Sequence, residues 1–200
     1  MLWTTELAGE TWMTDLPVTG NDRGHGMTIW LTGMPAAGKT TIGDALDARL
    51  TAEGHRTTRL DGDVLRSGLC SDLGFTIEDR HENVRRAGHV ALIVAQTGAI
   101  VIVSLISPYR DSRALVRELH SERGIGFIEV FVDTPLTECQ RRDPRGLYAK
   151  AGRHELAHMT GVDDPYEPPN APDVHVHPAG ESVSESAAKV LEALHSRLRT

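Results

Sequence analysis

The sequence has few cysteines, few aromatic residues and no long apolar run. Its 200 residues include only two cysteines, Cys70 and Cys139, and aromatic residues make up 4%. Two distant cysteines build neither a disulfide framework nor a CxxC metal or redox pair. No stretch approaches the roughly 20 apolar residues of a membrane span, and the first residues lack the features of a signal peptide. We therefore expect a cytoplasmic protein, with no membrane contact and a mostly aliphatic core.

A surplus of basic residues is also missing. Lys and Arg number 21 against 28 Asp and Glu, which gives a net charge of −7. This balance excludes a protein that coats nucleic acid, which would need a broad basic surface. Residues 1–26 carry four acids and one base, residues 163–200 seven acids and three bases, and residues 27–162 carry 17 of each. The middle of the chain is therefore neutral and free to bind anionic ligands locally.

Strand and helix patterns alternate from residue 27 onward, as in βαβ units. We expect strands at 27–32, 56–60, 99–106, 126–133 and 174–177, and helices at 40–52, 82–96, 111–122 and 182–198. Residues 141–172 are rich in charge, Gly and Pro, and we expect a mobile loop there with one short helix. These patterns predict an α/β fold, a parallel sheet flanked by helices, in one domain over 27–200. Residues 1–26 show no periodicity and are expected to form an N-terminal extension.

A phosphate-binding motif follows the first predicted strand. Gly33–Thr40 fits GxxxxGK[ST] between a strand and an amphipathic helix, which is the context that this P-loop requires. Its backbone N–H groups can cradle phosphates, Lys39 can reach the β- and γ-phosphates, and the Thr40 hydroxyl can help to hold Mg²⁺. We expect ATP to contact Gly33, Met34, Pro35, Ala36, Ala37, Gly38, Lys39, Thr40 and Thr41. The chain has no Asn-Lys pair, which excludes the guanine-reading NKxD motif of GTPases.

Carboxylates and arginines follow the second predicted strand. Asp61 and Asp63 come where open α/β sheets bind ligands, and they can serve a metal ion or accept a proton. Arg66, Arg80, Arg85 and Arg86 follow, with Asn83 among them. Guanidinium groups suit phosphate and sulfate oxygens, but the same arginines could also form a solvated helix face paired with nearby acids.

Seven segments in order closely resemble the adenylylsulfate kinases (APS kinases). They are DGDVLRSGL (61–69), DLGF (72–75), RHENVRR (80–86), ISPYR (106–110), FIEVFVD (127–133), RDPRGLY (142–148) and TGVDDPYE (160–167). The resemblance covers residues 28–168. It implies a P-loop nucleoside triphosphate hydrolase-type fold and transfer of the γ-phosphoryl group of MgATP to the 3′-hydroxyl of adenosine 5′-phosphosulfate (APS), giving PAPS. It also implies a homodimer and a lid over about 142–165.

The resemblance further implies roles for single residues. Asp63 would be the base or orienting group, Phe75 would stack on the adenine of APS, and Ser107 matches a serine described in the family as a phosphorylated intermediate. Direct in-line transfer needs no such intermediate. The implied catalytic residues are Lys39, Asp63 and Ser107, and the implied metal ligands are Thr40 and Asp61. The implied substrate contacts are Asp63, Arg66, Phe75, Arg80, Asn83, Ile106, Ser107, Arg145, Lys150 and Met159.

The chain departs from the family pattern at several positions. Ala36 and Ala37 replace Gly and Ser in the phosphate loop, Val64 stands where Asn is common, and Arg145 and Ala149 replace lysines of the lid. Met159 replaces an aromatic residue that would complete the adenine stack, so a kinase with another hydroxyl acceptor stays open as an alternative.

Other motifs suggest different functions. His154–His158 reads HExxH, and Asp164 extends it toward a zinc-protease pattern with Glu155 as base. Its position inside the predicted lid instead favours a short helix with exposed histidines. His175 and His177 point the same way on a predicted strand and could bind a metal ion or simply face solvent. A nucleotide-binding regulator without activity is disfavoured, because the P-loop and arginine set are intact.

Overall fold

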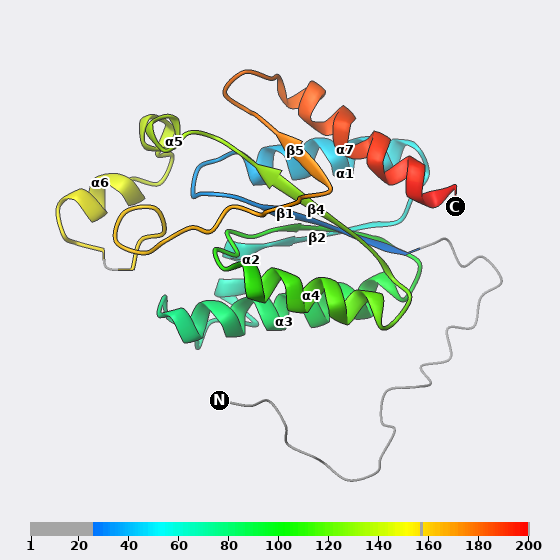
Figure 1. The fold of residues 1–200 in the computed structure, drawn as a ribbon, viewed down its shortest axis with the longest axis horizontal. Coiled ribbons are helices and arrows are strands. Elements are labelled where there is room, and N and C mark those ends of the chain that lie inside the picture. Colours follow the sequence, from blue (N-terminus) through cyan, green and yellow to red (C-terminus); the bar gives the residue numbers. More distant parts are fainter. Residues whose placement is uncertain (1–25, 157, 200) are drawn as a thin grey trace, which may run out of the picture.

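A five-stranded parallel sheet forms the centre of the molecule (Figure 1). The computed structural model describes residues 26–156 and 158–199. The strands are β1 (Met27–Thr32), β2 (Thr57–Asp61), β3 (Ile100–Ser104), β4 (Gly126–Val132) and β5 (Val174–Val176). Their order in the sheet is β2-β3-β1-β4-β5, and every neighbouring pair is parallel. The predicted α/β fold is therefore confirmed, and all carboxyl ends of the strands meet at one edge.

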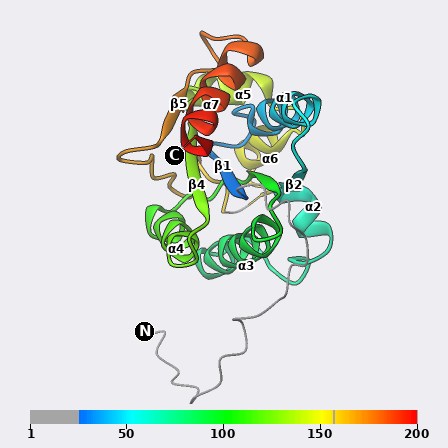
Figure 2. The same cartoon turned by 90° about the vertical axis from the view of Figure 1, so that its right-hand side faces the viewer.

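Helices cover both faces of the sheet (Figure 2). Their bounds are α1 (Lys39–Ala52), α2 (Gly62–Ser67), α3 (Ile77–Ala95), α4 (Arg110–Ser121), α5 (Leu136–Arg142), α6 (Leu147–Gly152) and α7 (Val183–Leu198). Helices α1 and α7 lie on one face, and α3 and α4 on the other (Figures 1 and 2). Neighbouring residues of β1 enter opposite layers: Ile29 and Leu31 pack with Leu46 of α1, whereas Trp30 packs with Ala91 of α3 and Val116 of α4.

Three elements differ from the sequence prediction. Helix α3 begins at Ile77, five residues before the expected 82, because the Thr76 hydroxyl caps it by accepting a hydrogen bond from Asp79 N (3.2 Å). The short helix α2 was not expected; the Asp61 carboxylate caps it by accepting from Asp63 N (3.0 Å). Strand β3 ends at Ser104 rather than residue 106, and Ser107 then has a positive φ of 39°.

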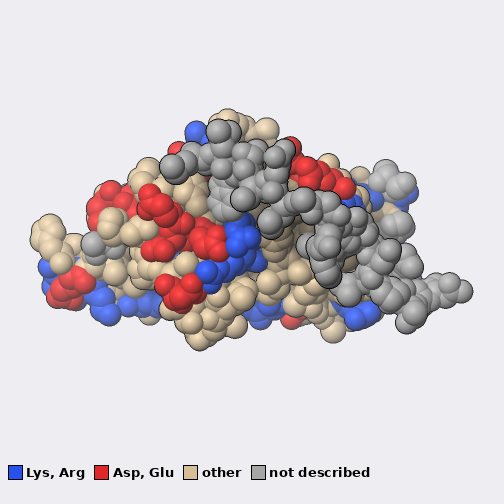
Figure 3. Space-filling model, turned by 90° about the horizontal axis from the view of Figure 1, so that it is seen from below, with Lys and Arg blue, Asp and Glu red and all other residues tan. Residues whose placement is uncertain are grey.

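The region expected to be a loop, 141–172, holds the end of α5, all of α6 and a bridge between Thr160 and Asp164. The predicted extension lies outside the described residues apart from Gly26. Among the described helices, none is long and apolar enough to cross a membrane. On the face in Figure 3, Lys and Arg side chains lie beside Asp and Glu side chains, so the visible part of that face carries no broad basic surface.

Candidate active site

The phosphate loop lies between β1 and α1, at the carboxyl edge of the sheet. Gly33 and Gly38 have φ values of 154° and 110°, and Ala36 has a φ of 60°. A Cβ atom at Gly33 would lie 2.5 Å from Val132 O, so a larger residue does not fit there. Helix α1 begins at Lys39, which directs its N-terminal N–H groups toward the loop. The chain thus forms a preorganised anion-binding loop.

Lys39 is held against the loop that it follows. Its Nζ donates hydrogen bonds to Gly33 O (2.9 Å) and Met34 O (2.7 Å), and the residue is only 9% exposed. Burial lowers the pKa of Lys39 to about 8, although Cys139, Asp61 and Asp63 partly offset this effect. A bound polyphosphate would add negative charge beside this buried ammonium group.

Thr40 and Asp61 lie side by side beneath the loop. The Thr40 hydroxyl donates to Asp61 Oδ2 at 2.8 Å, and Asp61 lies at the end of β2. Neighbouring ligands in a Mg²⁺ octahedron with bonds of 2.0–2.1 Å lie about 2.9 Å apart. The spacing of the two oxygens therefore fits two adjacent ligands of one Mg²⁺ ion.

Asp63, in the first turn of α2, forms an ion pair with Arg145, which lies between α5 and α6. The hydrogen bond from Arg145 to Asp63 raises the pKa of the guanidinium group. Both side chains stay more than half exposed, at 56% for Asp63 and 58% for Arg145. The pair thus joins the segment before α6 to a carboxylate that remains accessible to a substrate.

Two arginines lie close to the ring of Phe75. The guanidinium carbon of Arg66 lies 4.4 Å from the ring centroid and that of Arg80 lies 5.6 Å away. Arg66 donates to Leu73 O and Gly74 O, and Arg80 donates to Phe75 O. Burial lowers the pKa of both arginines. The ring itself is 45% exposed and offers a flat apolar surface beside two cations.

Several buried polar atoms nearby have no hydrogen-bond partner. They are Asn83 Nδ2, Tyr109 Oη, Thr160 Oγ1 and Asp164 Oδ2. A buried polar atom without a partner costs about 1–3 kcal/mol, so such atoms mark places where a ligand or water binds. Asn83 and Thr160 both line the cavity described next.

One cavity of about 690 Å³ runs from the phosphate loop to Phe75. Predicted site residues in its lining are Pro35, Ala36, Gly38, Lys39, Thr40, Thr41, Asp61, Asp63, Arg66, Phe75, Arg80, Asn83, Ile106, Ser107, Arg145 and Met159. Gly33, Met34 and Ala37 belong to the loop but do not line the cavity. Lys150 lies exposed on α6, also outside the lining. The structure therefore brings most of the predicted residues together.

Ser107 is buried and its hydroxyl faces the protein interior. Its Oγ accepts a hydrogen bond from Trp30 Nε1 and donates one to Thr32 Oγ1, both at 3.0 Å. Its carbonyl oxygen accepts from Arg113 Nη1 at 2.6 Å. These bonds hold the backbone turn at Ile106 and Ser107 beside the cavity.

The described residues of the HExxH segment, 154–156 and 158, lie in no helix, although a zinc protease or the predicted short lid helix would need one. His154 and His158 both have positive φ values, 59° and 58°, and both lie outside α6. That conformation is costly for residues with a Cβ atom and does not occur within a right-handed helix. Both histidines are exposed, as expected.

Comparison with known proteins assigns the family. A family model described as adenylylsulphate kinase matches residues 25–177. The chain belongs to this family. It is 51% identical over 175 residues to an adenylyl-sulfate kinase of Myxococcus xanthus, covering 88% of this chain and 94% of that protein. It is 47% identical over 180 residues to the bifunctional enzyme CysN/CysC of Mycobacterium tuberculosis, covering 90% of this chain but only 29% of that protein.

The structure of the Mycobacterium tuberculosis APS kinase CysC in complex with AMPPNP and APS is also similar. It superposes with a TM-score of 0.84 at 46% identity and covers 86% of this chain and 99% of that one. The P-loop kinase fold that the sequence predicts is therefore confirmed for this member of the adenylylsulphate kinase family.

Sequence reasoning missed several residues of this candidate site. Arg142 lines the cavity and donates to Ala37 O (3.3 Å) and Pro178 O (3.1 Å). Tyr148 Oη donates to Pro35 O (3.1 Å), and Thr134 Oγ1 donates to Ala37 O (2.8 Å). All three support the backbone of the phosphate loop. Arg142 and Tyr148 belong to the quoted RDPRGLY segment, which was the available signal.

Proposed function

We propose that this protein transfers the γ-phosphoryl group of ATP to the 3′-hydroxyl of APS. The observation that carries the proposal is one cavity whose lining includes the phosphate loop, the Phe75 and arginine pocket, and Asp63. Such a cavity suits two nucleotides bound end to end. The family membership and the similarity to an APS kinase that binds AMPPNP and APS support the same assignment.

The donor nucleotide would bind at the phosphate loop. Its β- and γ-phosphates would accept hydrogen bonds from the loop N–H groups and from Lys39, which must then leave the carbonyl oxygens of Gly33 and Met34. Thr40 and Asp61 would hold Mg²⁺, which supplies charge neutralisation at the transferring phosphoryl group. The bound phosphate would then be a negatively charged partner of the buried Lys39 ammonium group.

The acceptor would bind at the opposite end of the cavity. Its adenine would stack on the exposed face of Phe75, and its phosphosulfate group would meet Arg66 and Arg80. The amide of Asn83, whose Nδ2 has no protein partner, would donate a hydrogen bond to the acceptor. Met159 is buried at the cavity wall and can pack on the base as a flexible apolar group.

Asp63 would orient the attacking hydroxyl and receive its proton. The 3′-oxygen forms a bond to the γ-phosphorus while the bond from that phosphorus to the β,γ-bridging oxygen breaks, and ADP leaves. Arg145 would exchange its ion pair with Asp63 for the charge on the transferring group.

Residues 142–165 would act as the lid, which excludes water from the reaction. Ser107 would position the turn beside the acceptor through its bonds to Trp30 and Thr32. The expected homodimer stays a prediction.

The test is ADP release measured with a coupled assay, with APS, with AMP and with no acceptor. We expect ADP release to depend on APS, with little stimulation by AMP, which lacks the sulfate group. The product should be detected by an assay that is specific for 3′-phosphorylated nucleotides. ADP release that is equal with and without APS would overturn the proposal.

A further inference from the structure

One carboxylate and two imidazoles lie together at the ends of β4 and β5, outside the residues that line the cavity. Asp133 directly follows β4, His175 lies in the middle of β5, and His177 follows β5. His175 Nε2 donates to Asp133 Oδ2 at 2.9 Å, and His177 Nδ1 lies 3.7 Å from the same oxygen. The three ligand atoms all lie within 4.8 Å of one another. We propose that Asp133, His175 and His177 bind one divalent transition-metal ion such as Zn²⁺.

The sheet fixes the positions of all three side chains. Phe131 pairs with His175 in the β4–β5 register, and Asp133 N donates to Val176 O at 2.9 Å. His177 directly follows β5, and its ring centroid lies 4.1 Å from that of His175. The His175 ring stacks on Phe131, with centroids 4.9 Å apart, which restricts its orientation. His175 lies within a strand and the other two ligands lie one residue beyond strand ends, so the paired strands limit how far the three can move apart.

Two of the three distances between ligand atoms are close to those around a tetrahedral ion. With bonds of 2.0–2.1 Å, neighbouring ligands of Zn²⁺ lie about 3.3 Å apart. The observed separations from Asp133 Oδ2, 2.9 Å and 3.7 Å, lie on either side of that value. Two imidazoles and one carboxylate favour Zn²⁺, Ni²⁺ or Cu²⁺ over Mg²⁺, which prefers oxygen ligands. His175 would bind the ion through Nε2 after the proton now shared with Asp133 leaves.

Because the proposed site lies close to the phosphate loop, a bound ion would stabilise this part of the fold. Pro178 follows His177, and Arg142 connects the carbonyl oxygen of Pro178 to that of Ala37. A bound ion would tie β5 to the end of β4, close to this connection. Since only the folded chain presents the three ligands together, the ion should raise the melting temperature.

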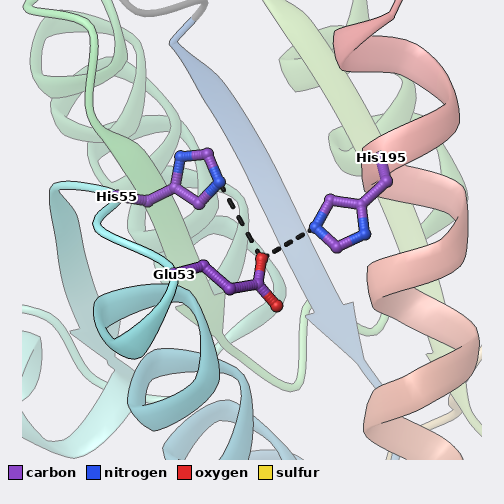
Figure 4. Close-up of side chains that lie close together, drawn as sticks. All are labelled: Glu53, His55 and His195. Atoms are coloured by element: carbon purple, nitrogen blue, oxygen red, sulfur yellow. Dashed lines mark hydrogen bonds and ion pairs between the residues drawn. The ribbon is translucent and has the colours of Figure 1, made fainter.

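A second cluster also combines one carboxylate with two histidines, but it lies on other elements of the fold. Glu53, His55 and His195 come from the C-terminal end of α1, the following turn and the last turn of α7 (Figure 4). His195 Nε2 donates to Glu53 Oε2 at 2.8 Å, and His55 Nε2 lies 3.9 Å from that oxygen. The ligand atoms of this cluster come from two helix ends and a turn, with no strand pairing to fix them. It serves as the matched control.

The experiment titrates Zn²⁺ into the full chain without nucleotide and without a histidine tag, by calorimetry, and repeats the titration with Co²⁺ in the visible range. The test variant is His175→Gln with His177→Gln, and the control is His55→Gln with His195→Gln. We expect the test variant to lose one site, or to bind at least about tenfold more weakly, since even supporting residues change metal affinity by about 10–100-fold. The control should keep that site.

Both variants are melted in metal-free buffer, so that any loss of folding is seen separately from loss of binding. The wild type and the control should show a Zn²⁺-dependent rise in melting temperature, and the test variant should not. Equal Zn²⁺ affinity in the wild type and a folded test variant would overturn the site. So would octahedral Co²⁺ spectra in all three chains, because they would indicate hydrated ions with no imidazole shell.

Discussion

The guanidinium group of Arg145 forms an ion pair with the carboxylate of Asp63, which joins the predicted lid to helix α2 across the mouth of the cavity. Both side chains are more than half exposed, so the pair contributes less than about 1 kcal/mol to stability. Arg145→Ala should therefore leave the melting temperature nearly unchanged. We expect kcat to fall by about 10²–10³, the typical cost of removing a group that stabilises transition-state charge. Steady-state kinetics with saturating ATP measures this; an unchanged kcat would remove Arg145 from the transfer step.

Asp63→Asn tests the other side of the same pair. The amide keeps the shape of the carboxylate but cannot accept the proton of the 3′-hydroxyl, so kcat should fall by about 10²–10⁴. ATP affinity should change less than about threefold, because Lys39, Thr40 and the loop N–H groups are untouched. Fluorescent-nucleotide binding checks the affinity, and Asp47→Asn, in α1 but outside the cavity lining, is the control. Turnover equal to that of the control would contradict the role of Asp63.

The sheet was predictable because its strands are marked by short-range patterns. Strand β1 occupies the expected residues 27–32, and the continuous apolar run of β3 is buried on both faces. Likewise, the phosphate loop is a local motif between a strand and a helix, and its glycines fix the backbone. These features need no knowledge of distant contacts.

What could not be predicted depends on contacts between distant residues. The Ser107 hydroxyl is directed inward by Trp30 and Thr32, which are more than 70 positions away in the chain. The HExxH spacing suggested a helix, but the backbone at His154 and His158 is left-handed. No pattern in the sequence marks these conformations, since tertiary contacts of the neighbouring residues impose them.

The lowered pKa of Lys39 predicts how ATP binding depends on pH. The ammonium form binds phosphate, and in the free protein burial places its pKa at about 8. ATP affinity should therefore be level below pH 8 and should weaken as pH rises above it, approaching tenfold per pH unit while bound Lys39 stays protonated. Equilibrium binding between pH 6.5 and 10, in one buffer series of constant ionic strength, checks this.

Lys39→Met gives the control for that dependence. Its ATP affinity should be weaker throughout and should lack the inflection near pH 8. An inflection that persists in Lys39→Met would assign the dependence to another group.

Ser107→Ala separates a positioning role from a phosphorylated intermediate. The substitution leaves Trp30 Nε1 buried without its acceptor, so unfolding free energy should fall by about 1–3 kcal/mol. We expect kcat to stay within about tenfold of wild type, because direct transfer needs no serine nucleophile. Incubation with ATP labelled at the γ-phosphate, without APS, should leave both proteins unlabelled. Stable labelling of the wild type that disappears in Ser107→Ala would support the intermediate instead.

Arg113 connects the turn at Ser107 to two other parts of the chain, and its removal should cost more stability than any substitution above. Its Nε pairs with Glu129 at 2.8 Å, and its Nη atoms donate to Ser107 O (2.6 Å) and Glu167 O (2.7 Å). The arginine side chain is 2% exposed and that of Glu129 is 11% exposed. Removing one partner of a buried pair typically costs 3–5 kcal/mol.

We expect Arg113→Ala to lower the free energy of unfolding by about 3 kcal/mol, the lower end of that range, because Arg117 still lies 3.4 Å from Glu129. Urea denaturation of the nucleotide-free chain measures the loss. The double substitution Arg113→Met with Glu129→Leu removes both charges and keeps most of the buried volume. It should therefore cost less than Arg113→Ala, since no buried charge is left without a partner. A larger loss in the double variant would show that the backbone hydrogen bonds to Ser107 and Glu167, and not the ion pair, account for the stability that Arg113 provides.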